Sequence, residues 1–196
     1  MEARQPFSRL GWALFAQMAV MLAAQWGVLL LARAARPGLL GEPVFLWAAS
    51  VLGAYGLGIP AACLVLRGTA APPAPARRPL GPVRFAALWA GSVGLAYLAN
   101  GATLLLTGLL GRLRGAAVVN PVESIGLYPL PLQLLLAGLI APAAEELLFR
   151  RLLLRRLRPY GERFALVASA LCFGLFHGNL NQFFYAFLLG LVLAEL

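Results

Sequence analysis

Long apolar stretches alternate with short polar connections along the whole chain. A helical membrane span needs ~20 apolar residues. Five stretches reach about that length: Trp12 to Ala32, Val44 to Leu66, Phe85 to Leu110, Leu132 to Leu153, and Phe164 to Tyr185. A sixth begins near Phe183 and is still apolar at Leu196. A cleaved signal peptide accounts for one short apolar stretch, not five. The pattern therefore predicts an all-α fold, a polytopic bundle of about five to six transmembrane helices.

The composition and the charge support this class and suggest an orientation. The chain is 61% hydrophobic and 12% charged, with a net charge of +9. Its 16 basic residues are all arginines and lie mostly in the connections, twelve on one side of the expected spans and four on the other. Because arginines are retained in the cytoplasm, we expect the N-terminus and the Arg150–Arg163 connection to be cytoplasmic. A nucleic-acid-binding protein needs a basic face on a soluble domain, and no segment is long enough to form one.

We therefore expect a multi-pass protein of the cell membrane whose partners include membrane lipids but no nucleic acid. Lysine is absent, while alanine, glycine, proline and arginine are abundant. This bias indicates a GC-rich genome and favours a prokaryotic inner membrane. We expect residues 1–130 to supply three N-terminal spans, and residues 131–196 to form a core that carries the scarcest polar groups of the chain.

Two short motifs in that core raise a question about chemistry. "EELLFR" runs from Glu145 to Arg150, and "FGLFH" ends at His177, the one histidine of the chain. An ionised side chain at the centre of a bilayer costs roughly 2.5–3.5 kcal/mol on insertion scales, so such residues usually serve a function. The apolar surroundings of these motifs predict a functional site.

The hairpin between the fourth and fifth spans brings the two motifs to one depth. Glu145 lies 14 residues before Pro159, and His177 lies 16 residues after Gly161. At 1.5 Å per residue these separations are ~21 and ~24 Å, so antiparallel helices place Glu145 opposite His177. A carboxylate beside an imidazole can hold a water molecule and take its proton. The pattern predicts hydrolysis by an activated water.

Other polar residues near the motifs have simpler interpretations. Glu146 and Arg150 are four residues apart and can pair on one helix face, about 100° from Glu145. That pair is as well explained by a structural role as by a catalytic one. Asn179 and Asn181 are candidates for capping helix ends after His177. Asn181 is also four residues from His177, within hydrogen-bonding reach of the imidazole.

The two motifs resemble those of a known family. "EELLFR" matches the EExxxR motif and "FGLFH" matches the FxxxH motif of the CPBP intramembrane proteases, which include type II CAAX prenyl endopeptidases and bacteriocin-processing and immunity proteins. The resemblance implies that residues 131–196 form an α-helical catalytic core and that the protein is a glutamate-dependent endopeptidase. It implies Glu145 and His177 as catalytic residues, with Glu146, Arg150 and Phe173 completing the motifs. The expected substrate is a membrane-associated or lipidated peptide or protein.

One family motif has no counterpart in the chain. The family has an HxxxN motif on a later helix, which is thought to hold the substrate oxyanion, whereas this chain has no second histidine. Loss of one oxyanion donor typically costs ~10²–10³ in rate. We therefore expect the native gene to continue beyond Leu196 with a helix that carries a histidine and an asparagine, and the activity of these 196 residues depends on it.

Three rival functions follow from the same residues. A catalytic zinc site normally takes three protein ligands. Glu145, Glu146 and His177 are the candidates, but adjacent glutamates diverge on a helix, so we expect no metal and no cofactor. An inactive membrane scaffold or immunity-type binding protein would keep the fold without the chemistry. A transporter would show paired broken helices in two halves, and the sequence shows no such pair.

Overall fold

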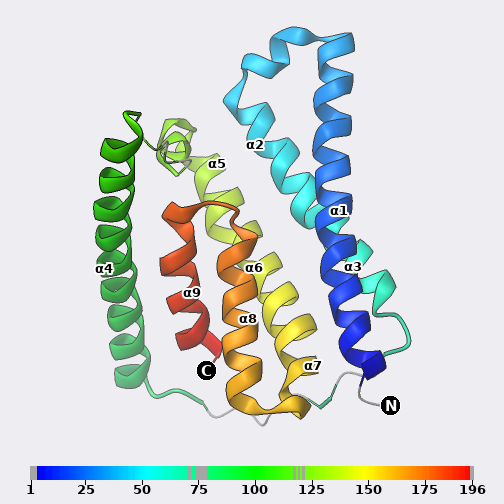
Figure 1. Ribbon diagram of the computed structural model, residues 1–196, viewed down its shortest axis with the longest axis vertical. Coiled ribbons are helices and arrows are strands. Elements are labelled where there is room, and N and C mark those ends of the chain that lie inside the picture. Colours follow the sequence, from blue (N-terminus) through cyan, green and yellow to red (C-terminus); the bar gives the residue numbers. More distant parts are fainter. Residues whose placement is uncertain are drawn as a thin grey trace. The chain divides into compact units, whose positions relative to one another are not determined.

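A computed structural model describes residues 4–69, 72–73, 79–116, 118, 120 and 122–194. The regular structure in these ranges is helical (Figure 1). Four helices are long and apolar enough to cross a membrane: Phe7–Ala35, Pro43–Val65, Pro82–Arg114 and Leu130–Tyr160. Each corresponds to one of the first four expected spans. The prediction of a polytopic helical membrane protein is confirmed.

The chain forms two compact units. The first comprises Met1–Ala71 and Gly126–Leu148, and the second comprises Pro72–Ile125 and Phe149–Leu196. The boundary between them falls inside the fourth long helix, between Leu148 and Phe149. The division expected from the sequence, at residue 130, follows the order of the spans and stays a prediction.

The first unit contains two complete spans and the beginning of a third. Its first span is α1 (Arg4–Ala35), and the short 3-10 helix η1 (Pro37–Gly41) leads to the next span. That second span is built from α2 (Pro43–Val51), η2 (Leu52–Gly58) and α3 (Ile59–Val65). The remaining part of the unit is α5 (Leu130–Leu135), η4 (Leu136–Ile140) and α6 (Ala141–Glu145).

Prolines explain why two of these segments are wider than an α-helix. Both η2 and η4 are π-helical. Pro60 follows two residues after the end of η2, and Pro142 follows two residues after the end of η4. Proline has no N–H to donate and its ring crowds the carbonyl four residues earlier, so the preceding helix departs from the regular pattern. Such π segments often occur at functional sites.

Small residues bring α1 against η2. A side chain at Gly53 would place its Cβ 3.0 Å from the carbonyl oxygen of Met21, and one at Gly58 would lie 3.0 Å from the carbonyl oxygen of Gln17. The Gln17 side chain is buried and its Nε2 donates to the carbonyl oxygen of Ala54 at 3.4 Å. Close backbone approach through glycine is the usual basis of helix packing in membranes. η2 is therefore held firmly against α1.

The second unit is built around the antiparallel hairpin of its last two helices, α8 (Glu162–Phe176) and α9 (Leu180–Ala194). Its other elements are α4 (Pro82–Arg114), the end of η5 (Glu146–Leu154), α7 (Arg155–Leu157) and η6 (Arg158–Tyr160). The 3-10 helix η3 (Glu123–Leu127) crosses the boundary between the units. α9 lies between α8 and α4 and packs on both (Figure 1).

Glycines allow α8 and α9 to pack closely. A Cβ at Gly174 of α8 would lie 3.0 Å from the carbonyl oxygen of Phe183. A Cβ at Gly190 of α9 would lie 3.0 Å from both Cα and Cβ of Ala170. Real Cβ atoms need about 3.5–4.0 Å from carbon neighbours. These two positions therefore set the distance between the two helices.

The turn between α8 and α9 corrects one expectation. The fifth span was expected to continue from Phe164 to Tyr185, but α8 ends at Phe176 and α9 begins at Leu180. Gly178 has φ +65° and ends α8 in the left-handed region that favours glycine. The sixth span thus begins three residues earlier than expected, and its last two expected residues, 195 and 196, lie outside the described ranges.

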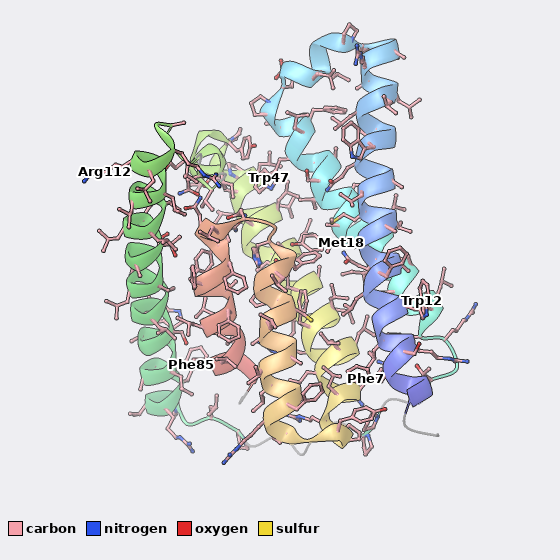
Figure 2. The ribbon with its side chains drawn as sticks, in the orientation of Figure 1. Phe7, Trp12, Met18, Trp47, Phe85 and Arg112 are labelled. Carbon is pink, nitrogen blue, oxygen red and sulfur yellow. The ribbon has the colours of Figure 1, made fainter. Side chains whose placement is uncertain are left out.

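Apolar side chains cover the outside of the long helices. Figure 2 shows Trp12 projecting from α1 and Phe85 from α4, and these side chains are 61% and 60% exposed. Many leucines of α1 and α4 are also exposed. In water such surfaces would drive aggregation, whereas a bilayer covers them. This surface agrees with the membrane assignment.

Candidate active site

Glu145 is the last residue of α6, and a tyrosine from the second span holds its side chain. The Tyr55 hydroxyl donates a hydrogen bond of 2.8 Å to Oε1 of Glu145. Tyr55 lies in the π-helical segment η2, and both residues belong to the first unit. Both side chains are partly buried, whereas that of Glu146 is exposed. Glu145 is therefore held against another helix of its unit.

The position of Tyr55 within its span is the feature of the sequence that could have identified it, although a hydropathy profile does not show it. Tyrosines of membrane proteins concentrate at the two interfaces with water, but Tyr55 lies near the middle of the span Pro43–Val65. A hydroxyl at that depth needs an acceptor. The acceptor lies 90 residues further along the chain, which no local pattern indicates.

Arg150 connects η5 to α9 within the second unit. Its Nη1 donates to the carbonyl oxygen of Gly190 at 3.3 Å. The Ser169 hydroxyl, which is fully buried in α8, donates to the carbonyl oxygen of Phe149 at 2.9 Å. These two bonds fix η5 against the α8–α9 hairpin. They give Arg150 a structural function, and its expected pairing with Glu146 stays a prediction.

Phe173, the first residue of the FxxxH pattern, belongs to an aromatic cluster. Its ring centroid lies 5.1 Å from that of Phe149 and 5.1 Å from that of His177. Phe149 also packs against Phe176, with 5.4 Å between centroids. Tilted and edge-to-face arrangements at these distances are favourable for aromatic rings. The cluster restricts the imidazole to one side of the end of α8.

A hydrogen bond to its own helix determines which nitrogen of His177 can act as a base. Nδ1 lies 2.9 Å from the carbonyl oxygen of Phe173. A carbonyl only accepts hydrogen bonds, so this bond requires the proton on Nδ1. In the neutral imidazole the lone pair is then on Nε2. Nε2 is the atom of His177 that can accept a proton or a hydrogen bond from water.

The turn after His177 is built by asparagine and glutamine. Asn179 caps α9, since its Oδ1 accepts from the backbone N–H of Gln182 at 2.9 Å. Its Nδ2 donates to the His177 carbonyl at 2.8 Å and to Oε1 of Gln182 at 2.7 Å. The expectation that Asn179 caps a helix is confirmed. Asn181 is buried in the first turn of α9, and its hydrogen bond to the imidazole stays a prediction.

The predicted site residues are distributed over the two units. Glu145 and Glu146 belong to the first unit, whereas Arg150, Phe173 and His177 belong to the second. Within its own unit each catalytic candidate has a defined hydrogen-bond partner, Tyr55 for Glu145 and the Phe173 carbonyl for His177. The approach of Glu145 to His177 stays a prediction. Among the described residues no cluster of three His, Cys, Asp or Glu side chains could hold a metal ion.

The part of the chain that carries both motifs matches a family model. Residues 128–196 match the model described as type II CAAX prenyl endopeptidase Rce1-like. This segment therefore resembles the Rce1-like family. The match agrees with the resemblance drawn from the EExxxR and FxxxH patterns and with the helical structure of the segment. The Rce1-like segment begins at Tyr128, so Tyr55 lies outside it. No curated protein and no solved structure matches the chain.

Proposed function

We propose that the chain is an intramembrane endopeptidase in which Glu145 activates water to hydrolyse a peptide bond of a membrane-associated or lipidated substrate. The observation that carries the proposal is a hydrogen-bonded glutamate inside a membrane span of the Rce1-like segment. An acidic side chain at that depth is costly and is usually retained for function. The matched family is one of endopeptidases, which hydrolyse peptide bonds.

In the proposed reaction, Glu145 and His177 act on the same water molecule. The Glu145 carboxylate takes a proton from a water molecule while Nε2 of His177 accepts a hydrogen bond from the other water hydrogen. The water oxygen bonds to the carbonyl carbon of the peptide, and the carbonyl oxygen becomes an oxyanion. When the carbon–nitrogen bond breaks, the proton held by Glu145 passes to the departing amine. This step consumes one water and no other reagent.

Cleavage by the full chain in proteoliposomes tests the proposal. The probe is a farnesylated peptide ending in a CAAX sequence, and the same peptide without the lipid reports whether lipidation is required. Mass spectrometry should find two peptide products with the wild-type chain. Glu145→Gln should lower the rate about 10²–10⁴-fold, because the amide cannot take the proton.

A matched variant separates catalysis from general damage. Glu42→Gln makes the same change at an exposed glutamate before α2 and should leave the rate unchanged. Equal rates in Glu145→Gln and the wild type would refute the proposed role of Glu145. Binding of the probe without any cleavage by the wild type would instead support the inactive scaffold.

A further inference from the structure

We propose that Tyr55 is a positioning residue that holds Oε1 of Glu145 and so fixes the orientation of the carboxylate that takes the proton from water. The hydrogen bond itself is observed, whereas its effect on catalysis rests on the proposed function. It gives the helices that precede the Rce1-like segment a part in the active site. Because Tyr55 acts through Glu145, it does not itself need to touch the substrate.

The geometry of the hydrogen bond is what the role requires. The bond of 2.8 Å joins the Tyr55 hydroxyl to one named oxygen of Glu145. A carboxylate has two equivalent oxygens and several rotamers, so without a partner it presents no fixed atom to a water molecule. A donor on Oε1 restricts the rotamers that the carboxylate can adopt. The carboxylate is thereby prepared before the substrate binds.

Tyr55 itself is held by the packing of η2 on α1. The neighbouring residue, Ala54, has its carbonyl oxygen bonded by the buried Gln17 side chain. On either side, Gly53 and Gly58 allow the α1 backbone to approach to distances that a Cβ would prevent. A rigid support of this kind is what keeps a functional group within the narrow tolerance of a reaction. This arrangement explains the polar residue Gln17 in the first span, because its side chain bonds the backbone next to Tyr55.

A second contact joins the second span to the residues just before α5. The rings of Trp47 in α2 and Tyr128, just before α5, are stacked with 4.5 Å between centroids and 14° between planes. The two contacts are eight residues apart in the second span. Both contacts join the second span to the part of the chain that leads to Glu145, so tertiary structure as well as its own rotamer places the Tyr55 hydroxyl.

A simpler explanation is that the tyrosine hydroxyl is merely satisfied by the nearest acceptor. In that case Tyr55→Phe lowers stability slightly and leaves turnover by the folded protein unchanged. In the positioning role, kcat falls about 10- to 100-fold with little change in KM, because the lost bond to a charged group is needed at the chemical step. The split between kcat and KM therefore discriminates between the two roles.

The experiment compares the wild type, Tyr55→Phe and Tyr97→Phe in proteoliposomes with the farnesylated CAAX peptide. Tyr97 is an exposed tyrosine of α4, and its variant should match the wild type. An independent readout is the infrared band of the Glu145 carboxyl, isolated by subtracting the spectrum of Glu145→Gln. Tyr55→Phe should shift this band, and Tyr97→Phe should not.

The two readouts keep the inference separate from the proposed function. If the wild type cleaves nothing, the proposed function fails, and the infrared band still decides whether Tyr55 holds Glu145. An unshifted band in Tyr55→Phe would overturn the inference whatever the activity. A shifted band with an unchanged kcat would overturn the positioning role and leave only a structural bond.

Discussion

Replacement of Gly190 with alanine should force α8 and α9 apart. The new Cβ would lie 3.0 Å from Cα and Cβ of Ala170 and 3.3 Å from Cδ1 of Phe173. Carbon atoms prefer about 3.5–4.0 Å, and the Ala170 backbone cannot move without its helix. The strain of one added methyl group in a packed interior is about 1–3 kcal/mol.

Two smaller effects act on the same variant in opposite directions. Separation of the helices lengthens the bond from Arg150 to the Gly190 carbonyl, which is already 3.3 Å, and its loss costs about 1 kcal/mol. Alanine favours the helix over glycine by about 1 kcal/mol, which offsets that loss. The net cost stays at about 1–3 kcal/mol and corresponds to a fall in Tm of roughly 2–12 °C.

Thermal unfolding in detergent micelles, followed by far-UV circular dichroism, measures this cost. The matched control is Gly101→Ala in α4, where an added Cβ has no neighbour within 4 Å. That variant gains helix propensity without strain, so its Tm should equal or exceed that of the wild type. A Gly190→Ala variant as stable as Gly101→Ala would refute the close packing of the hairpin.

Three further predictions address the turn, the orientation and the chemistry. Asn179→Ala removes the cap of α9 and should lower the unfolding free energy by about 1 kcal/mol; an unchanged denaturation curve would contradict the capping role. Reporter fusions after Arg158 should read cytoplasmic and fusions after Arg114 external, and the reverse result would invalidate the arginine argument. EDTA should leave the cleavage rate unchanged, whereas inhibition that added zinc reverses would establish a metal-dependent site.

The first four spans could be predicted from the sequence because a helix that crosses the bilayer needs a long apolar stretch, and hydropathy shows the length of that stretch. The expected fourth span began at Leu132, within two residues of the helix Leu130–Tyr160. The same signal misplaced the end of the fifth span, since the residues on both sides of the turn are apolar. There the backbone decides: Gly178 ends one helix and Asn179 begins the next. A hydropathy window averages over both residues and therefore does not detect the turn.

The candidate site was predictable only as far as its residues are rare. Glu145 and His177 stand out because charged and imidazole groups are exceptional in an apolar segment. Tyr55 does not, because an apolarity scale counts its ring and ignores its hydroxyl. The support from Gln17 and the glycines of η2 depends on how α1 meets η2. Those contacts arise from tertiary packing and leave no local pattern in the sequence.

The length of α8 bears on how the protein enters the membrane during synthesis. At 15 residues the helix measures ~22 Å, against a hydrocarbon thickness of ~30 Å. Its limits are set within the chain, by Gly161 before it and Gly178 after it. A segment this short is poorly retained by the insertion machinery alone. We therefore expect α8 and α9 to enter the bilayer together, as a hairpin. His177 would then reach its final depth only after α9 has been synthesised.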